Sequence, residues 1–84
     1  MVYAMLVCRS LTYAQRTAAV LERSGISSFV QRTPGTFAPT GCSYSVKLPY
    51  GRLEAALERL RGEELPPKTI LRVGEDGSIE EVAL

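Results

Sequence analysis

Apolar residues cover both faces of the N-terminal segment, residues 2–9. Its even positions are Val2, Ala4, Leu6 and Cys8, and its odd positions are Tyr3, Met5 and Val7. A strand that is apolar on both faces is typical of the centre of a sheet covered on both sides. This segment is therefore predicted to be a central β-strand.

A first helix is predicted over residues 12–24, where Ala14, Ala18 and Leu21 recur on one face. Either Ser10 or Thr12 is expected to cap its start, and the spacing of Thr12 and Gln15 fits a capping box. Gly25 is expected to end it, because glycine readily adopts the positive φ of a helix C-cap.

A second amphipathic helix is predicted over residues 50–61 and is closed by Gly62. Its apolar positions follow i, i+3, i+4 and i+7 spacing: Leu53, Ala56, Leu57 and Leu60. The pattern indicates one buried stripe.

Alternating or apolar segments predict strands at residues 26–32, 43–48 and 69–73. Residues 74–78 are rich in turn formers and lead into a short strand over residues 79–82. The predicted order is therefore strand, helix, strand, strand, helix, strand, followed by one further strand.

This order predicts the α+β class and, with right-handed crossovers, a ferredoxin-like split βαβ fold (βαββαβ). The sheet should be antiparallel, with two helices on one face and an extra C-terminal hairpin, in a single domain over residues 1–84. No helix remains for the other face, so Tyr3, Met5 and Val7 should be exposed there. Exposed apolar patches often mark contact surfaces, and we expect a homodimer.

Composition narrows the possible partners. The 84 residues include ten Lys and Arg against nine Asp and Glu, a net charge of +1. Neither nucleic acid nor a membrane surface is expected as a partner, because both are bound through a large excess of basic residues. The N-terminal apolar segment has no preceding positive region and is far too short to span a bilayer, so a cytoplasmic protein is expected.

The chain contains no histidine and only two cysteines, without a Cys-x-x-Cys pair. These residues offer no spacing for a metal site and no Cys–His or Ser–His catalytic pair. No metal and no cofactor are therefore expected.

Residues 32–44 are the most informative segment. They contain two prolines, two glycines and three threonines, and are expected to form neither helix nor sheet. Cys42 lies at the end of this loop, where solvent and partners can reach a thiol. Cys42 is therefore the candidate functional residue, although a cysteine can also be a small apolar core residue.

The predicted topology brings other groups towards Cys42. The first and third strands should be antiparallel neighbours, so Cys8 and Arg9 should lie beside Cys42 and Ser43, with Arg32 and the helix start at Ser10 to Thr12 at the same edge. A helix N-terminus and guanidinium groups lower the pKa of a thiol, and the thiolate is the reactive form. Cys8 is either an apolar core residue or a second thiol that resolves a modified Cys42.

Four segments resemble a known family: residues 9–16, 24–26, 31–34 and 41–44. They are similar in order and content to the selenium/sulfur carrier-like family of small cysteine-loop domains, and the closing residues 75–78 are similar to the tail of some members. The most specific element is Thr33-Pro34, a short loop and Gly41-Cys42. Ser43 departs from this pattern, because members often have glycine there.

The resemblance implies a thiol carrier that accepts sulfur or selenium on Cys42, as a persulfide or selenopersulfide, and passes it to an acceptor. Donor and acceptor proteins would be its partners, and Arg9, Ser10, Thr12, Arg32, Thr33, Pro34, Gly41 and Ser43 would line the site. Such transfer is stoichiometric, so the sequence does not decide whether the protein is an enzyme. The alternative is a regulatory or assembly module that binds a partner or ligand through residues 33–44.

Overall fold

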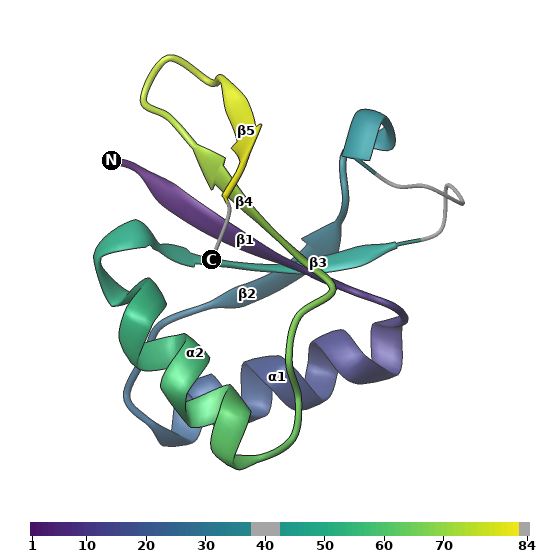
Figure 1. Cartoon of the computed structure of the whole chain (residues 1–84), viewed down its shortest axis with the longest axis vertical. Helices are drawn as coiled ribbons and strands as arrows, with labels where there is room; N and C mark the ends of the chain where they lie inside the picture. The colour runs from purple at the N-terminus through teal and green to yellow at the C-terminus, as the bar shows by residue number, and fades with distance from the viewer. Residues whose placement is uncertain (38–42, 83–84) are drawn as a thin grey trace.

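The computed structural model describes residues 1–37 and 43–82 (Figure 1). Its helices and strands follow one another along the chain as β1 (Tyr3–Cys8), α1 (Leu11–Arg23), β2 (Phe29–Arg32), η1 (Gly35–Phe37), β3 (Tyr44–Pro49), η2 (Tyr50–Arg52), α2 (Leu53–Gly62), β4 (Thr69–Val73) and β5 (Ile79–Glu81). The two η elements are single 3₁₀ turns.

The five strands form one sheet in the order β2-β3-β1-β4-β5, and every neighbouring pair is antiparallel. The prediction of an antiparallel sheet with a central first strand is confirmed. The register pairs Cys8 of β1 with Tyr44 of β3, and Tyr44 in turn with Arg32 of β2. The end of β1 therefore lies level with the start of β3 and the end of β2.

Both helices pack on the same face of the sheet (Figure 1). Ala4, Leu6 and Cys8 of β1 point into this layer and share one core with both helices. The helical residues buried in the layer are Ala14, Thr17, Val20 and Leu21 of α1, and Leu53, Ala56 and Leu60 of α2. Two helices on one face therefore account for one apolar side of β1.

The helix-free face of the sheet differs from the expectation. Met5 and Val7 are buried within this one chain, so the prediction that they form an exposed patch is wrong. They form a second cluster with Leu71, and Phe37, Val73 and Ile79 pack against it. Phe37 belongs to η1, which lies across the sheet from the helices (Figure 1). The homodimer stays a prediction, without this reason for it.

The start of α1 is capped by Ser10, whose hydroxyl accepts a hydrogen bond from the Tyr13 backbone N–H at 3.2 Å. The alternative cap, Thr12, is an exposed residue of the first turn. The predicted capping box of Thr12 and Gln15 is therefore wrong, because the helix begins at Leu11, two residues earlier than that pattern requires.

Gly25 ends α1 as predicted, with φ +76. The Gly25 N–H donates to the Glu22 carbonyl, and the Ile26 N–H donates to the Leu21 carbonyl at 2.8 Å. These two bonds form a Schellman motif, which satisfies carbonyls at the helix end. They also explain why β2 begins later than predicted: Ile26 is held against the end of α1 and buried there.

The second helix ends differently from the prediction, because Gly62 is still helical. Glu64 takes the positive φ of 57 instead, and the Leu65 N–H donates to the Leu60 carbonyl. A glutamate in this conformation costs more than a glycine would. The start also differs, since the predicted first turn is the 3₁₀ turn η2.

A 3₁₀ turn also lies in the segment that was expected to contain no helix. The Phe37 N–H donates to the Pro34 carbonyl at 2.9 Å and closes η1. That expectation is wrong for Gly35 to Phe37. A single turn is compatible with the glycine and proline content of the segment, because such turns are short connectors.

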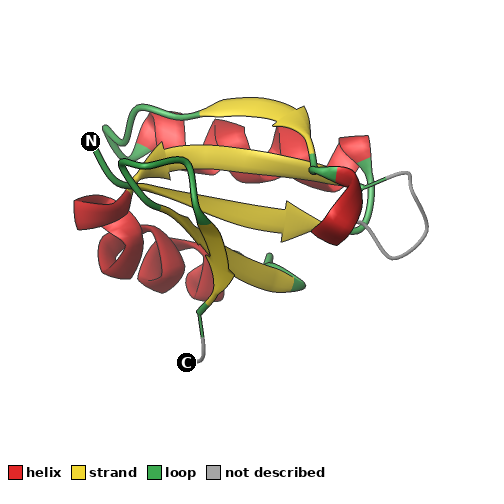
Figure 2. Ribbon diagram, turned by 90° about the horizontal axis from the view of Figure 1, so that it is seen from above, coloured by secondary structure: helices red, strands yellow, loops and turns green. Residues whose placement is uncertain are grey.

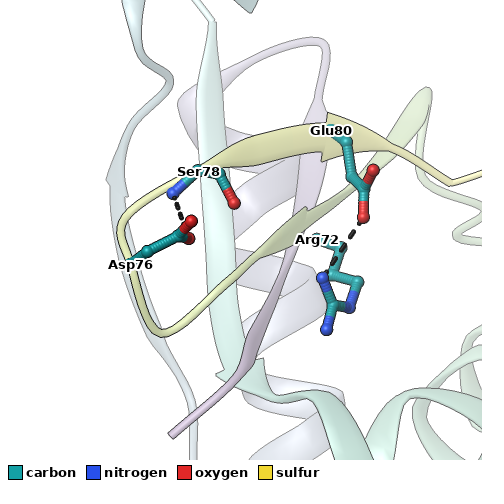
Figure 3. Close-up of polar contacts among 4 residues, drawn as sticks. All are labelled: Arg72, Asp76, Ser78 and Glu80. Carbon is teal, nitrogen blue, oxygen red and sulfur yellow. Dashed lines mark hydrogen bonds and ion pairs between the residues drawn. The ribbon is translucent and has the colours of Figure 1, made fainter.

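Side-chain contacts lie within the turn between β4 and β5 and between the two strands (Figure 3). The Ser78 backbone N–H donates to Asp76 at 3.0 Å, and Arg72 pairs with Glu80 at 3.2 Å. The bonds to Ser78 lower the pKa of Asp76. Gly77 supplies the positive φ of 85 that the turn requires.

Candidate functional site

Hydrogen bonds join the residues that flank the segment 34–42. The Thr33 N–H donates to the Ser43 carbonyl at 3.0 Å. The Thr33 hydroxyl is hydrogen-bonded to the Ser45 hydroxyl, and Ser45 is fully buried. Thr33 and Ser43 are themselves buried polar residues. The loop therefore starts and ends at one defined place on the sheet, between the end of β2 and the start of β3.

Two exposed arginines lie at this end of the sheet, each against a half-buried tyrosine. The Arg9 guanidinium lies 4.9 Å from the centre of the Tyr13 ring, and the Arg32 guanidinium lies 5.8 Å from that of Tyr44. Such cation–π contacts hold a guanidinium against the surface without neutralising its charge. Within residues 1–37 and 43–82, neither arginine forms a salt bridge. Among the described residues, both charges are therefore without an acidic partner.

The N-terminus of α1 opens at the same end of the sheet, because only Arg9 and Ser10 separate it from β1. Ser10 occupies one backbone N–H of the first turn through its capping bond. The aligned peptide dipoles of a helix place partial positive charge at such an end. The arginines and the helix N-terminus therefore give this region a positive character.

Cys8 is buried, with 4% of its surface exposed, and faces the helix layer. Its sulfur lies within hydrogen-bonding distance of the Leu6 carbonyl, at 3.5 Å, and of the Thr17 hydroxyl, at 3.9 Å. Burial raises the pKa of the Cys8 thiol, although the bond to Thr17 partly offsets that effect. A neutral, enclosed thiol is a poor nucleophile at neutral pH. Cys8 can therefore resolve a modified cysteine only after local opening of the fold.

The structure brings together most of the predicted site residues that it describes. Cys8, Arg9, Ser10, Arg32, Thr33 and Ser43 gather at the end of the sheet where β1 and β2 stop and β3 begins. Pro34 follows as the acceptor of the η1 turn. Thr12 is exposed in the first turn of α1 and makes no capping bond. Gly41 and Cys42 lie outside the described residues.

Two residues of this region were missed by the sequence reasoning. Thr17 contacts the Cys8 thiol, and Ser45 bonds Thr33. Thr17 could have been found from helical spacing, since it lies three residues after Ala14 and four before Leu21. Ser45 could not have been found in this way, because the alternation of β3 places it on the same face as Lys47, and only the pairing with β2 shows its partner.

A groove of about 600 Å³ lies elsewhere, between the C-terminal halves of α1 and α2. It contains charged groups of both signs, and Arg23 pairs with Glu63 there at 3.8 Å. None of the predicted site residues that the structure describes lines it. The groove therefore belongs to the opposite end of the helix layer from Ser10.

Metal-ligating residues do not cluster in the described residues, where no group of three or more His, Cys, Asp or Glu could hold an ion. No helix in residues 1–37 and 43–82 is long and apolar enough to cross a membrane.

Comparison with known proteins gives one finding. The family described as "Putative Se/S carrier protein-like" matches residues 3–72, from the first residue of β1 to the last but one of β4. No curated protein and no solved structure matches the chain.

Proposed function

The chain belongs to the "Putative Se/S carrier protein-like" family, and on this premise we propose that it is a thiol carrier for sulfur or selenium. Cys42 is the proposed carrying residue. The observation that supports this choice most strongly is the state of Cys8, which is buried and has a raised pKa. Of the two cysteines in the chain, Cys42 is the one that follows a loop with a fixed base.

The proposed transfer is a thiolate exchange without net oxidation. The Cys42 thiolate attacks the outer sulfur of a donor persulfide, a sulfur–sulfur bond forms to Cys42, and the donor leaves as a thiolate with the electron pair of the broken bond. A nucleophile on the acceptor then attacks the same outer atom and releases the Cys42 thiolate. With selenium as the outer atom, the same two displacements apply. No step requires Cys8.

Arg9, Arg32 and the N-terminus of α1 are proposed to stabilise the thiolate, since positive charge lowers the pKa of a thiol. Ser10, Thr12, Thr33, Pro34, Gly41 and Ser43 are proposed to shape the surroundings. The unpaired arginines at the described end of the sheet support this assignment. Donor and acceptor proteins are the proposed partners, in the cytoplasm.

The fold assignment is also a proposal. The strand order β2-β3-β1-β4, with both helices on one face, supports a ferredoxin-like arrangement. The antiparallel pairing of β4 with β5 supports a C-terminal hairpin added to it. We propose a single domain over residues 1–84.

The carrier role is tested by loading the purified protein with glutathione persulfide and measuring its intact mass. We expect the mass of one added sulfur atom in the wild type and in Cys8→Ala, and no addition in Cys42→Ser. A parallel incubation with selenite and glutathione tests for one added selenium atom. Loading that persists in Cys42→Ser, or that fails in the wild type with both donors, contradicts the carrier role. The latter result favours the alternative, a module that binds partners through residues 33–44.

The proposed electrostatic role of Arg32 is tested separately, by the pH dependence of Cys42 alkylation in a Cys8→Ala background. Arg32→Ala should raise the pKa of the thiol, and the alkylation rate at neutral pH should fall. Arg59→Ala is the matched control, because Arg59 lines the groove between the helices. Equal profiles for both variants would exclude a contribution of Arg32.

A further inference from the structure

The two edges of the sheet differ in how well they are protected against pairing with another strand. At one edge, β5 has three residues, and Glu80 and Glu81 are exposed. At the other edge, β2 runs Phe29-Val30-Gln31-Arg32, without lysine, proline or acidic residue (Figure 2). Proteins commonly block strand edges by shortness, by charge or by proline. In charge and proline content the edge of β2 is therefore unprotected, apart from the arginine at its end, and only its length of four residues limits pairing.

The hydrogen bond from the Thr33 N–H to the Ser43 carbonyl shows which backbone groups of β2 face outward. In an antiparallel pair, hydrogen-bonded and non-hydrogen-bonded residue pairs alternate. This bond makes Arg32–Tyr44 a non-hydrogen-bonded pair, and the same then holds for Val30–Val46. The backbone N–H and C=O of Val30 and Arg32 therefore point away from β3, towards the free edge.

These outward groups are complementary to those of a second copy. When two β2 strands lie antiparallel with Val30 opposite Val30, each Val30 N–H meets the Val30 carbonyl of the other copy. The same register sets Arg32 opposite Ser28 of the second copy, two positions along. The arrangement has a two-fold axis, so one patch serves both partners and the assembly closes at two chains.

Charge favours this pairing over pairing through β5. The two Arg32 residues would lie four positions apart along the paired strands, about 13 Å. That separation exceeds the Debye length of about 8 Å at physiological salt, so their repulsion is mostly screened. In the three residues of β5, Glu80 and Glu81 would oppose the same charges of another copy at close range.

Phe29 gives the pairing an apolar contribution. It is 53% exposed, and the Lys47 ammonium lies 5.8 Å from the centre of its ring. Phe29 is on the helix-free face, since it pairs with Lys47, which pairs with Met5. In the two-fold arrangement it would lie opposite Gln31 of the second copy, which would cover part of its ring. We therefore propose that two copies of this chain associate through their β2 edges into one continuous ten-stranded antiparallel sheet.

This proposal does not depend on the carrier role, and it replaces the exposed sheet face as the reason to expect a homodimer. Four residues a side make a small interface, below the size of most stable complexes. We expect a weak dimer that dissociates on dilution.

Sedimentation equilibrium of the full chain over a wide concentration range tests the proposal with two variants of one residue. Val30→Pro removes the outward N–H of Val30 and no bond to β3, because the bonds to β3 belong to Phe29 and Gln31. We expect its dimerisation constant to fall at least tenfold, while Val30→Ala, which keeps the N–H, should stay within about threefold of the wild type. Circular dichroism checks that both variants are folded.

Amide hydrogen exchange of the wild type provides a second test that needs no variant. The amides of Val30 and Arg32 should become protected as the protein concentration rises, whereas that of Gln31, already bonded to β3, should not change. The proposal would be overturned by a monomer at every concentration or by a dimer that persists in Val30→Pro. It would also be overturned if the exchange rate of the Val30 amide did not depend on protein concentration. Growth beyond the dimer would also overturn it, since pairing of β2 with β5 forms an open filament.

Discussion

Two buried hydroxyls connect the flanks of the candidate loop. Thr33 lies just after β2, Ser45 lies within β3, and their side chains share one hydrogen bond beneath the surface. A buried hydroxyl that loses its partner carries the full cost of its desolvation. Removing one of the two hydroxyls should therefore cost more stability than the net strength of the hydrogen bond itself.

A double-mutant cycle measures this bond. Thr33→Val should lower the free energy of unfolding by about 1–3 kcal/mol, because the Ser45 hydroxyl is left buried without its partner. Thr33→Val with Ser45→Ala should cost less than the sum of the single variants, by about 1 kcal/mol. The measurement is denaturant unfolding of all four proteins. Additive costs would show that the two hydroxyls do not interact.

The raised pKa of the buried Cys8 thiol predicts that the stability of the protein depends on pH. Burial raises its pKa in the folded protein above the unfolded value of about 8.5, so the folded state retains the proton in a pH range where the unfolded state loses it. Its contribution is complete below the unfolded pKa and is lost as pH rises through the folded pKa. The free energy of unfolding should therefore fall more steeply in the wild type than in Cys8→Ala as the pH rises above the unfolded pKa of about 8.5.

The control is made in variants without Cys42, whose own titration would otherwise contribute: Cys8→Ala with Cys42→Ser should lack the loss of stability at high pH that Cys42→Ser, which keeps Cys8, still shows. The Cys42→Ser variant should be alkylated slowly at neutral pH, because its remaining thiol is enclosed between β1 and α1. Identical pH profiles of wild type and Cys8→Ala, or alkylation of Cys42→Ser at the rate of a free thiol, would contradict the described state of Cys8.

At the scale of the elements, the ends of α1 decide where the chain can place the candidate site. Ser10 starts the helix directly after β1, and the Schellman motif at Gly25 turns the chain back towards β2. Arg9 lies in the short connection and reaches the ring of Tyr13 one turn into the helix. A later start would move the helix N-terminus away from the sheet edge.

Ser10→Ala and Thr12→Ala form a matched pair that tests the cap. Ser10→Ala should destabilise the protein by about 1 kcal/mol, because the Tyr13 N–H loses its acceptor. Thr12→Ala should change stability by no more than a few tenths of a kcal/mol, since Thr12 is an exposed helical residue and alanine is the better helix former. Chemical denaturation measures the free energy of unfolding of both variants. A larger loss of stability for Thr12→Ala than for Ser10→Ala would show that Thr12, and not Ser10, caps the helix.

At the scale of the molecule, the two faces of the sheet carry unequal shares of the core. The helix side contains thirteen buried residues in one cluster, and the helix-free side contains three. The stability of the whole chain should therefore depend chiefly on the helix layer. A domain of this length is expected to be stable by roughly 4–13 kcal/mol, so single core changes matter.

Leu21 and Leu11, both in α1, compare a core position with a surface one. Leu21 is fully buried, and Leu21→Ala should cost about 2–5 kcal/mol through lost contacts and a cavity. Leu11 is 41% exposed, and Leu11→Ala should cost less than about 1 kcal/mol. Thermal and chemical unfolding measure both. Equal costs would mean that α1 does not pack on the sheet as described.

The sequence by itself determined the elements whose signal is local. Alternation and helical spacing located the central strand, both helices and the C-terminal strands, and the glycine after Ser24 marked the end of α1. The sequence also limited the candidate reactive residues, because the chain has two cysteines and no histidine. The family resemblance seen in the segments around Arg9, Arg32 and Cys42 is confirmed by the match to residues 3–72.

Only the tertiary structure decided which surfaces are covered and which hydroxyls are paired. Met5 and Val7 look exposed in a scheme with helices on one face, yet η1, β4 and β5 supply side chains that pack against them. Likewise Cys8 and Thr17, nine residues apart, meet because α1 lies against β1. Periodicity reports which side of an element is apolar, whereas burial and partnership depend on contacts between segments that are distant in the chain.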